Sequence, residues 1–223
     1  MSLVLYSYYR SSAAYRVRIA LNLKNLDYSI RPVHLLNHGG EQNQAGYLEI
    51  NPQGLVPALH SEDGLLTQSG AIIEYLDERF PSPRLLPENA GDRALVRSLA
   101  QMIACDIHPL NCLRVLTYLW PDSGSPDKKQ QWCHHWLEMG LSAFEIRLER
   151  AGSNGEFCFG NAPGLADLFL IPQVYNALRF NHGIERYPLI QGIYRNCTTI
   201  EAFREAAPES QPDSPESIIL GEI

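Results

Sequence analysis

The sequence lacks the motifs of several common protein classes. It contains no GxSxG, HExxH, P-loop or GxGxxG motif, which excludes the usual hydrolase, metalloprotease and nucleotide-binding sites. No apolar run reaches the ~18 residues that a membrane-spanning helix needs. The opening stretch MSLVLYSYYR also lacks the basic and apolar regions of a secretory signal peptide. We therefore expect a soluble, cytoplasmic protein with no membrane partner.

Cysteine and positive charge are both scarce. The chain has 5 cysteines, an odd number with no CxxC pair, which argues against a disulfide framework and a zinc site and fits a reducing cytoplasm. Cys133, His134 and His135 are adjacent and cannot converge on one helix face, so we expect no metal. With 18 Lys and Arg against 25 Asp and Glu, the net charge is −7, the wrong sign for a nucleic-acid partner. A small anionic ligand would need locally concentrated arginines.

What is present predicts a folded chain of one large or two small domains. It has 223 residues, 45% hydrophobic and 19% charged. The first part alternates strand and helix patterns with turn residues between them. We predict strands at 3–8, 27–34, 56–59 and 64–66, helices at 13–24 and 69–79, and a short helix before Asn51. The order β-α-β-α-β-β-α predicts an α/β N-terminal domain over residues 1–80.

Proline marks the expected domain boundary. Three prolines fall within eight residues at 80–87, which neither a helix interior nor a central strand accepts, so we place a linker at 81–89. Helical patterns follow at 90–120, 126–150, 165–179 and 188–203. We predict an all-α domain over residues 90–223, a kink at Pro109 in its first helix, and an extended tail from Pro208.

Several sequence blocks resemble one family. The stretch from Tyr6 to Lys24, with Tyr8-Tyr9-Arg10-Ser11-Ser12 near its start, closely resembles the N-terminal signature of zeta-class glutathione transferases, the family of maleylacetoacetate isomerase and maleylpyruvate isomerase. Blocks at 51–57, 68–76 and 165–174 resemble the same family in order and spacing, so the likeness covers residues 3–215. It implies a thioredoxin-like N-terminal domain that binds glutathione, an all-α substrate domain, and a homodimer.

Ser11 is the main candidate for activating the glutathione thiol. It lies in the turn between the first strand and the first helix, where helix amides and the positive end of the helix dipole favour an anion. A cysteine-like thiol has a pKa of about 8.5, so a hydrogen bond from Ser11 favours the thiolate. The alternatives are an ordinary N-cap serine, or one of Tyr6, Tyr8 and Tyr9 in that role, since other transferase classes use a tyrosine near the first strand.

The resemblance also implies the other glutathione contacts. It implies a cis-proline turn at Val56-Pro57 that offers the Val56 backbone to the cysteinyl part of glutathione. Ser69, which we expect to cap the helix that it opens, and Gln68 before it match the site of the γ-glutamyl carboxylate. The remaining implied glutathione contacts are Ser12, Gln42 for the glycyl end, and His108.

Three arginines suggest a dicarboxylate substrate, because arginine binds carboxylates in two-point geometry. Arg10, Arg114 and Arg179 match arginines that bind the substrate in the maleylpyruvate branch; for each, a solvated surface charge is the alternative. The implied reaction is a glutathione-dependent cis–trans isomerisation in aromatic catabolism. The thiolate held by Ser11 adds to the maleyl double bond, and Arg10 with another arginine stabilises the resulting enolate. Rotation and loss of glutathione then give the fumaryl isomer.

The chain departs from the family at two positions. Ala13 stands where the family has a cysteine, which weakens the maleylacetoacetate assignment more than the general chemistry. Gly164 replaces the expected serine or threonine before Asp167, so half of a helix-capping box is missing, and we assign Asp167 to folding. Two other functions stay open: a transferase or dehalogenase for small α-haloacids, and a non-catalytic interaction module.

Overall fold

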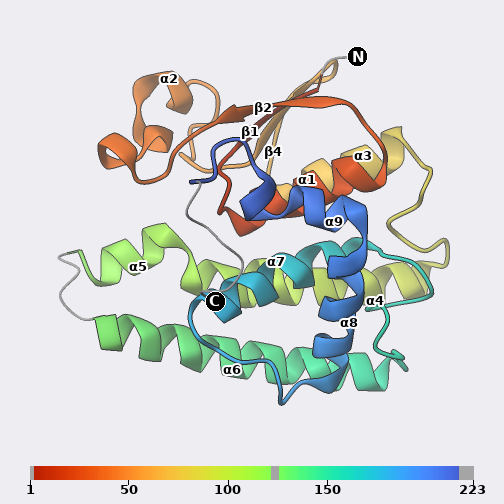
Figure 1. The fold of residues 1–223 in the computed structure, drawn as a ribbon. Helices are drawn as coiled ribbons and strands as arrows, with labels where there is room; N and C mark the ends of the chain where they lie inside the picture. The colour runs from red at the N-terminus through yellow and green to blue at the C-terminus, as the bar shows by residue number, and fades with distance from the viewer. Residues whose placement is uncertain (1–2, 122–125, 216–223) are drawn as a thin grey trace. The chain divides into compact units, whose positions relative to one another are not determined.

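The structure, a computed structural model, describes residues 3–121 and 126–215 and divides into two compact units (Figure 1). The first unit comprises Met1–Arg84 together with the segment that begins at Ile200, and the second comprises Leu85–Thr199. The boundary after Arg84 falls inside the linker expected at 81–89. The sequence placed residues 200–223 in the second domain, whereas in the structure the described part of this segment packs with the first unit.

A four-stranded sheet forms the centre of the first unit. Its strands are β1 (Leu3–Ser7), β2 (Tyr28–Pro32), β3 (Ala58–Ser61) and β4 (Gly64–Thr67), in the order β2-β1-β3-β4. β1 pairs with β2 in parallel and with β3 antiparallel, and β3 pairs antiparallel with β4. Leu5 and Leu59 are fully buried in the two central strands. The predicted alternation of strands and helices is confirmed.

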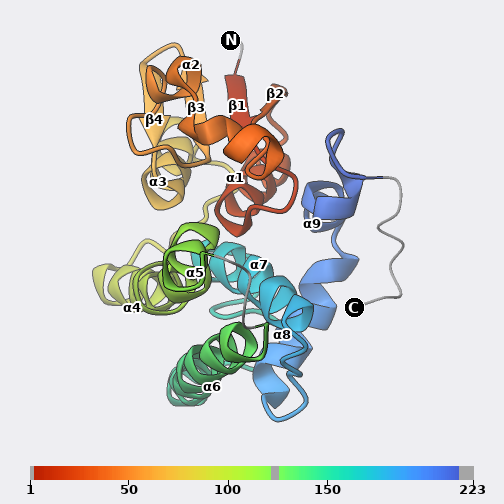
Figure 2. The same ribbon diagram turned by 90° about the vertical axis from the view of Figure 1, so that its left-hand side faces the viewer.

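Helices α1 (Ser12–Leu23) and α3 (Ser69–Arg79) pack side by side on one face of this sheet (Figure 2). Ile72, Ile73 and Leu76 point into the core, as their helical spacing predicts. The segment between β2 and β3 holds two 3₁₀ turns, η1 (Asn37–Gly39) and η2 (Glu41–Asn43), and the short helix α2 (Ala45–Leu48).

The second unit is helical, as expected, but its first helix is not continuous. α4 (Ala90–Gln101) leads into a π-helical turn, η3 (Met102–Ile107), then a 3₁₀ turn, η4 (His108–Asn111), and finally α5 (Leu113–Leu119). Cys112 between the last two is extended, with ψ 152°. The prediction of one kinked helix over 90–120 is therefore wrong. The segment from Met102 to Cys112, which contains Pro109, separates α4 from α5.

Three longer helices complete the second unit: α6 (Pro126–Arg150), α7 (Leu165–Arg179) and α8 (Pro188–Thr199). Residues 165–177 of α7 are all buried, so this helix is the core of the unit. Asp167 accepts hydrogen bonds from the backbone N–H groups of Gly164 and Cys158, both at 2.8 Å. Burial raises the pKa of Asp167 to about 6. Its contacts agree with a folding role for this carboxyl.

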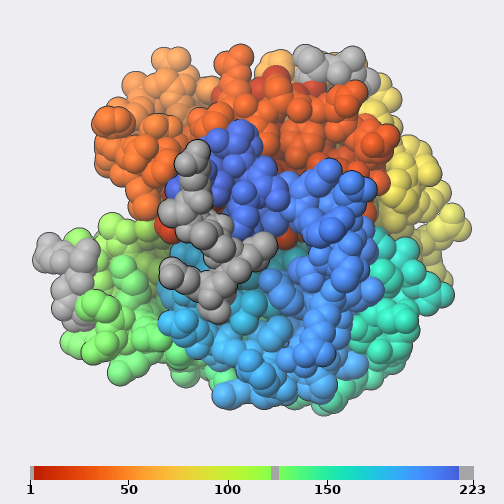
Figure 3. Space-filling view, viewed as in Figure 1, coloured from red at the N-terminus to blue at the C-terminus, as the bar shows by residue number. Residues whose placement is uncertain are grey.

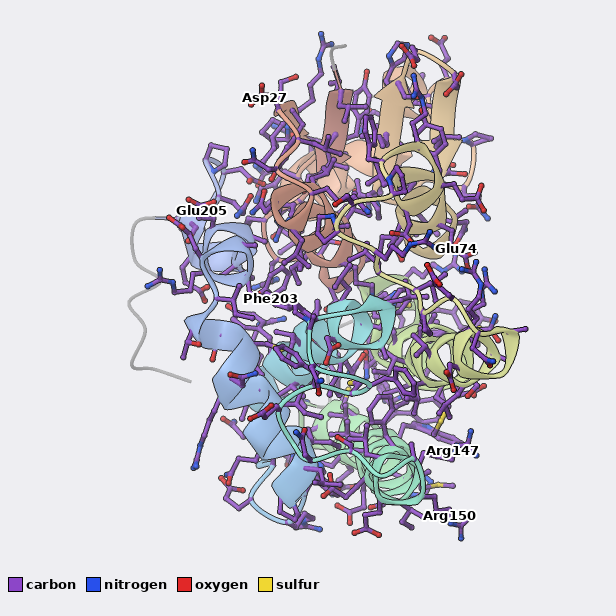
Figure 4. All side chains as sticks on the ribbon, turned by 90° about the vertical axis from the view of Figure 1, so that its right-hand side faces the viewer. Asp27, Glu74, Arg147, Arg150, Phe203 and Glu205 are labelled. Carbon is purple, nitrogen blue, oxygen red and sulfur yellow. The ribbon has the colours of Figure 1, made fainter. Side chains whose placement is uncertain are left out.

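The last described segment forms a second helix and a turn. The helix predicted over 188–203 is divided at Ile200, where ψ is 129°, so that α9 (Glu201–Ala206) is separate from α8. Phe203 and Glu205 point to different sides of α9; Phe203 is fully buried and Glu205 is exposed (Figure 4). A 3₁₀ turn, η5 (Pro208–Ser210), follows, and Gln211 donates to the Glu205 and Ala207 carbonyls. The expectation of an extended surface tail from Pro208 is wrong up to residue 215.

Within residues 3–121 and 126–215, none of the helices combines the length and the apolar character that crossing a membrane requires.

Candidate functional site

The sheet topology brings three of the predicted glutathione-binding segments of the first unit to one edge. Tyr6 of β1 lies opposite Ala58 of β3, and Ala58 lies opposite Thr67 of β4. Because β3 runs antiparallel to both neighbours, the end of β1, the start of β3 and the end of β4 meet at the same edge. The turn with Ser11, the Val56-Pro57 turn and the Gln68-Ser69 step extend from these three strand ends.

Ser11 is the N-cap residue of α1. Its backbone is extended (φ −70°, ψ 115°), and its Oγ accepts a hydrogen bond from the backbone N–H of Ala14 at 3.2 Å. This bond uses a lone pair of Oγ and leaves the hydroxyl proton to a different partner. Ser11 therefore is an N-cap residue, as one of the two interpretations expected. Capping is compatible with donation of a hydrogen bond from the Ser11 hydroxyl to a thiolate at the positive end of the helix.

The residues around Ser11 differ in exposure. Arg10 is partly exposed, and its guanidinium lies 5.9 Å from the centroid of the Tyr9 ring. Tyr8 and Tyr9 are buried, with ring centroids 4.6 Å apart, and belong to an aromatic and aliphatic cluster with Val33 and Tyr47. Burial in that cluster favours a packing role for these two tyrosines over activation of a thiol.

The peptide bond between Val56 and Pro57 is cis, as the family resemblance implies. Val56 is buried, and none of the hydrogen bonds within the described residues uses its backbone N–H or carbonyl. The preceding carbonyl, of Leu55, accepts from Tyr47 Oη at 2.7 Å and from Asn51 Nδ2 at 2.8 Å. These two bonds fix the backbone at Leu55. The backbone N–H and carbonyl of the next residue, Val56, have no hydrogen-bond partner among the described residues.

The step into α3 differs from the expectation. Gln68, not Ser69, occupies the N-cap position, and its side chain makes no capping bond; Ser69 is the first helical residue and is buried. Gln68 has φ 69° and ψ 114°, a strained conformation for a residue with a Cβ, which costs on the order of 1–3 kcal/mol. Strain of this kind is concentrated at ligand sites.

Two residues that support this step were not assigned a role from the sequence. Arg16 of α1, which is almost fully buried, donates from Nη1 to Ser69 Oγ at 3.2 Å. Gln53 accepts from Gln68 Nε2 at 2.8 Å. The available signal for Arg16 was its place, like that of Arg18, among the apolar residues of a helix expected to pack on a sheet, because a cation buried there requires compensating contacts. The sequence carries no comparable signal for Gln53.

Gln42 lies in η2 with part of its side chain buried. Its Nε2 donates weakly to the Leu35 carbonyl at 3.5 Å, while its buried Oε1 has no hydrogen-bond partner among the described residues. Gly40, at φ 95°, packs directly against the Gln42 side chain, and a Cβ there would collide with the amide. A glycine at this position thus satisfies both the backbone conformation and the space that Gln42 needs.

Three further predicted residues belong to the second unit. His108 begins η4 and is partly buried, and Arg114 lies exposed in the first turn of α5. Arg179 is the last residue of α7 and donates from Nη1 to Asn176 Oδ1 at 3.4 Å. Asn176 in turn donates to Asn111 Oδ1 at 3.0 Å. The roles of His108, Arg114 and Arg179 stay predictions.

Metal-ligating side chains and buried thiols are other chemistry-bearing groups of the described residues. Within the described ranges, no cluster of three or more His, Cys, Asp and Glu side chains could hold a metal ion. Burial raises the pKa of Cys133 to about 11 and that of Cys158 above the ordinary thiol value. These thiols stay protonated at neutral pH and are poor nucleophiles.

This chain is similar in sequence and structure to known proteins over nearly its whole length. The family profile described as the N-terminal domain of glutathione S-transferase matches residues 5–84. The chain is 50% identical to a probable maleylacetoacetate isomerase of Vibrio cholerae, over 96% of this chain and 99% of that protein. A solved holo structure of maleyl pyruvate isomerase, a bacterial zeta-class glutathione S-transferase, is 43% identical, with a TM-score of 0.91 over 95% and 100% of the two chains.

A second solved structure carries ligands. The maleylacetoacetate isomerase of Methylobacterium extorquens AM1, with bound malonate and glutathione, is 41% identical to this chain. Its TM-score is 0.89 over 95% of this chain and 99% of that chain.

Proposed function

Because this chain belongs to the zeta class of glutathione transferases, the family of the maleylacetoacetate and maleylpyruvate isomerases, we propose that it is a glutathione-dependent cis–trans isomerase. Its substrate is a maleyl dicarboxylate from the breakdown of aromatic compounds. The observation that carries the proposal is the geometry of Ser11, whose oxygen caps α1 while its proton is left to bind an anion. The cofactor is glutathione, as bound in the related Methylobacterium structure.

Three features of the first unit support a glutathione site. The unpaired backbone N–H and carbonyl of Val56 suit the backbone-like pairing of the cysteinyl residue. Ser69 and the first amides of α3, with the Arg16 cation behind them, suit the γ-glutamyl carboxylate. The unpartnered Oε1 of Gln42 suits an N–H donor at the glycyl end. Glutathione has a complementary group for each of these three features.

When bound, glutathione supplies a sulfur nucleophile that adds to the cis double bond and leaves again after rotation. The chain's residues make that chemistry favourable. Ser11 donates a hydrogen bond from its hydroxyl to the sulfur and, with the dipole of α1, favours the thiolate. Arg10, the residue before Ser11, holds a guanidinium for the negative charge that develops on the substrate.

Arginines are also the proposed determinants of substrate choice. A maleyl substrate carries two carboxylates, and we assign Arg114 and Arg179 to the binding of the substrate together with Arg10. The family resemblance associates an arginine at position 114 with the maleylpyruvate branch, so maleylpyruvate is the favoured substrate and maleylacetoacetate the alternative. The malonate bound in the Methylobacterium relative is a small dicarboxylate and supports this substrate class.

The decisive experiment measures turnover of a maleyl substrate with a trace of glutathione. We expect many moles of fumaryl product per mole of glutathione, because the thiol is regenerated in each cycle. Ser11→Ala should reduce turnover at pH 7 at least about 100-fold, since it removes the donor that favours the thiolate. Ser11→Thr is the matched control, because it retains both the hydroxyl and the cap.

The other outcomes identify the alternatives. Consumption of one thiol per substrate, with chloride release from an α-haloacid, would show a transferase or dehalogenase instead. No turnover and no retention on immobilised glutathione would show a non-catalytic module. Undiminished turnover of Ser11→Ala would remove the proposed role of this hydroxyl.

Two further assignments are part of the proposal. We place the protein in the cytoplasm, where glutathione keeps its 5 cysteines reduced. We also assign a homodimer, in keeping with the family resemblance. Light scattering coupled to gel filtration measures the mass in solution, which is twice 25.1 kDa for a dimer.

A further inference from the structure

Arg18 of α1 is a fully buried cation bound only by neutral groups. Its Nε donates to the Ala206 carbonyl at 2.9 Å, and its Nη2 donates to the Tyr9 carbonyl at 2.9 Å. Its Nη1 donates to Ser7 Oγ at 3.0 Å and, more weakly, to the Tyr8 carbonyl at 3.4 Å. Burial lowers its pKa to about 10, so it is still charged at neutral pH. Burying a charge without a carboxylate contact is costly, and the hydrogen bonds to backbone and hydroxyl oxygens offset that cost.

What these bonds fix is the chain segment that precedes the catalytic turn. Ser7, Tyr8 and Tyr9 are consecutive and lead directly to Arg10 and Ser11. The backbone N–H of Ser11 donates to the Tyr8 carbonyl at 2.9 Å, so Arg18 and Ser11 share one acceptor. A shift of that carbonyl would move Ser11, whose Oγ must lie within hydrogen-bond distance of the sulfur.

The segment that follows α9 supplies the second half of this support. Asp213 accepts a hydrogen bond from the backbone N–H of Tyr9 at 2.9 Å. Both backbone polar groups of Tyr9 are therefore held, the carbonyl by Arg18 and the N–H by Asp213. The negative charge of Asp213 also raises the pKa of Arg18, which keeps the cation charged despite its burial.

The segment that carries Ala206 and Asp213 is attached to α1 at further points. Tyr15 Oη donates to the Phe203 carbonyl at 3.2 Å, and Asn22 Nδ2 donates to the Ala202 carbonyl at 3.1 Å. α9 packs along α1, and Figure 3 shows this last described segment against the N-terminal residues of the same unit. The segment is thus built into the first unit next to the residues that precede Ser11.

We propose that Arg18 and Asp213 are positioning residues for Ser11, and that the segment from Ile200 to Ser214 is a functional part of the glutathione-binding unit. The inference rests on the proposed function of Ser11. Neither residue takes part in the reaction as an acid, base or nucleophile. Together they fix the Tyr9 peptide from both sides, so that the hydroxyl two residues later meets the glutathione sulfur.

Asp213→Leu and Asp213→Asn are the informative pair of variants. The leucine removes the acceptor for the Tyr9 N–H, whereas the asparagine keeps an oxygen acceptor there and serves as the conservative control. Glu205→Gln, an exposed carboxylate on the same segment, controls for the loss of a charge (Figure 4). Arg18→Lys and Arg18→Met test the other side, but their buried position makes folding the first thing to verify by circular dichroism.

The measurement is the ultraviolet absorbance of the bound glutathione thiolate against pH, together with kcat and the KM for glutathione. For Asp213→Leu we expect the thiolate pKa to rise by about one unit and kcat at neutral pH to fall about tenfold. The KM for glutathione should change less than threefold, because Val56, Gln68 and Ser69 are untouched. Asp213→Asn and Glu205→Gln should match the wild type. A purely structural role would lower the amount of folded protein without moving the thiolate pKa.

The outcomes separate this inference from the proposed function. If Asp213→Leu is folded and its thiolate titration is unchanged, the positioning role is refuted while the isomerase assignment stands. If the wild type turns over no maleyl substrate but the thiolate pKa still rises in Asp213→Leu, the isomerase assignment fails and the positioning role stands. If Asp213→Asn lowers kcat and raises the thiolate pKa as much as Asp213→Leu does, the charge of Asp213 and not its hydrogen bond to Tyr9 is responsible. That result would overturn the proposed positioning role.

Discussion

Arg16 Nη1 donates a hydrogen bond to Ser69 Oγ at 3.2 Å and so joins α1 to the first turn of α3. Both residues are buried. The bond fixes the hydroxyl oxygen of Ser69, which leaves its proton to donate, and it places a cation behind the helix N-terminus. Three sources of positive potential thus act together at the position proposed for the γ-glutamyl carboxylate: the helix amides, the Ser69 proton and the guanidinium.

The first prediction follows from this arrangement. Ser69→Ala should raise the KM for glutathione about tenfold, which corresponds to the loss of one hydrogen bond to a charged group, with kcat changed much less. Arg16→Gln should raise it further, and the double variant should show less than the product of the two single effects, because the residues act through one contact. Steady-state kinetics with varied glutathione measures this. Effects that multiply exactly would show that the two residues act separately.

The second prediction concerns Gly40, whose missing side chain makes room for Gln42. Gly40→Ala should raise the KM for glutathione about as much as Gln42→Ala does, because the added methyl group displaces the Gln42 amide. Gly39→Ala is the matched control: Gly39 has φ 77°, so an alanine there meets a similar backbone strain, but its Cβ has nothing within 4 Å. If Gly39→Ala weakens glutathione equally, strain in the loop and not the position of Gln42 explains the effect.

Much of the first unit could be predicted from the sequence because local patterns and tertiary structure agree there. The β1 strand, α1 and α3 have regular hydrophobic spacing, and Ser11 has the residue type and position of an N-cap. The cap of α3 was misplaced by one residue. Ser69 has the preferred chemistry for that position, but the left-handed conformation of Gln68 starts the helix one residue earlier, and no propensity rule predicts such a conformation for glutamine.

The parts that could not be predicted depend on contacts between residues distant in sequence. The bond between Asp213 and Tyr9 spans 204 positions, and no periodicity in the tail indicates it. In the same way, the proline-rich composition after Pro208 is typical of an extended chain, while the buried Gln211 and its backbone contacts hold it folded. The continuous helical pattern over 90–120 likewise did not indicate the π-helical turn or the extended Cys112, because the hydrophobic pattern does not record local changes of backbone conformation.

The third prediction tests the substrate arginines. Arg114→Met and Arg179→Met should each raise the KM for a maleyl dicarboxylate about tenfold or more, and leave the KM for glutathione within about twofold, because a charge-assisted hydrogen bond to the substrate is lost. Arg195→Met on α8 removes an exposed arginine without a proposed role and is the control. For a substrate with one carboxylate esterified, one of the two variants should have the same KM as the wild type, because the arginine that it lacks has no carboxylate to bind. An unchanged KM in both variants would show that these arginines are solvated surface charges and do not bind the substrate.

The fourth prediction concerns the pH dependence of stability at Asp167. Its pKa is raised from 3.8 to about 6 by burial, so the folded state binds its proton more tightly than the unfolded chain does. The stabilising contribution of the protonated carboxyl is therefore fully present below about pH 4 and is lost as the pH rises through 6.

Asp167→Asn has no such titration. It should be less stable than the wild type at pH 4, since an amide oxygen replaces only one of the two acceptors used by Gly164 and Cys158. The difference should then shift by about 2 kcal/mol in favour of the variant between pH 4 and pH 8. Urea unfolding of both proteins across this range measures the shift. If the wild type's stability relative to the variant is constant or grows with pH, the carboxyl is ionised in the folded protein throughout. Its two backbone hydrogen bonds would then outweigh the effect of burial on its pKa.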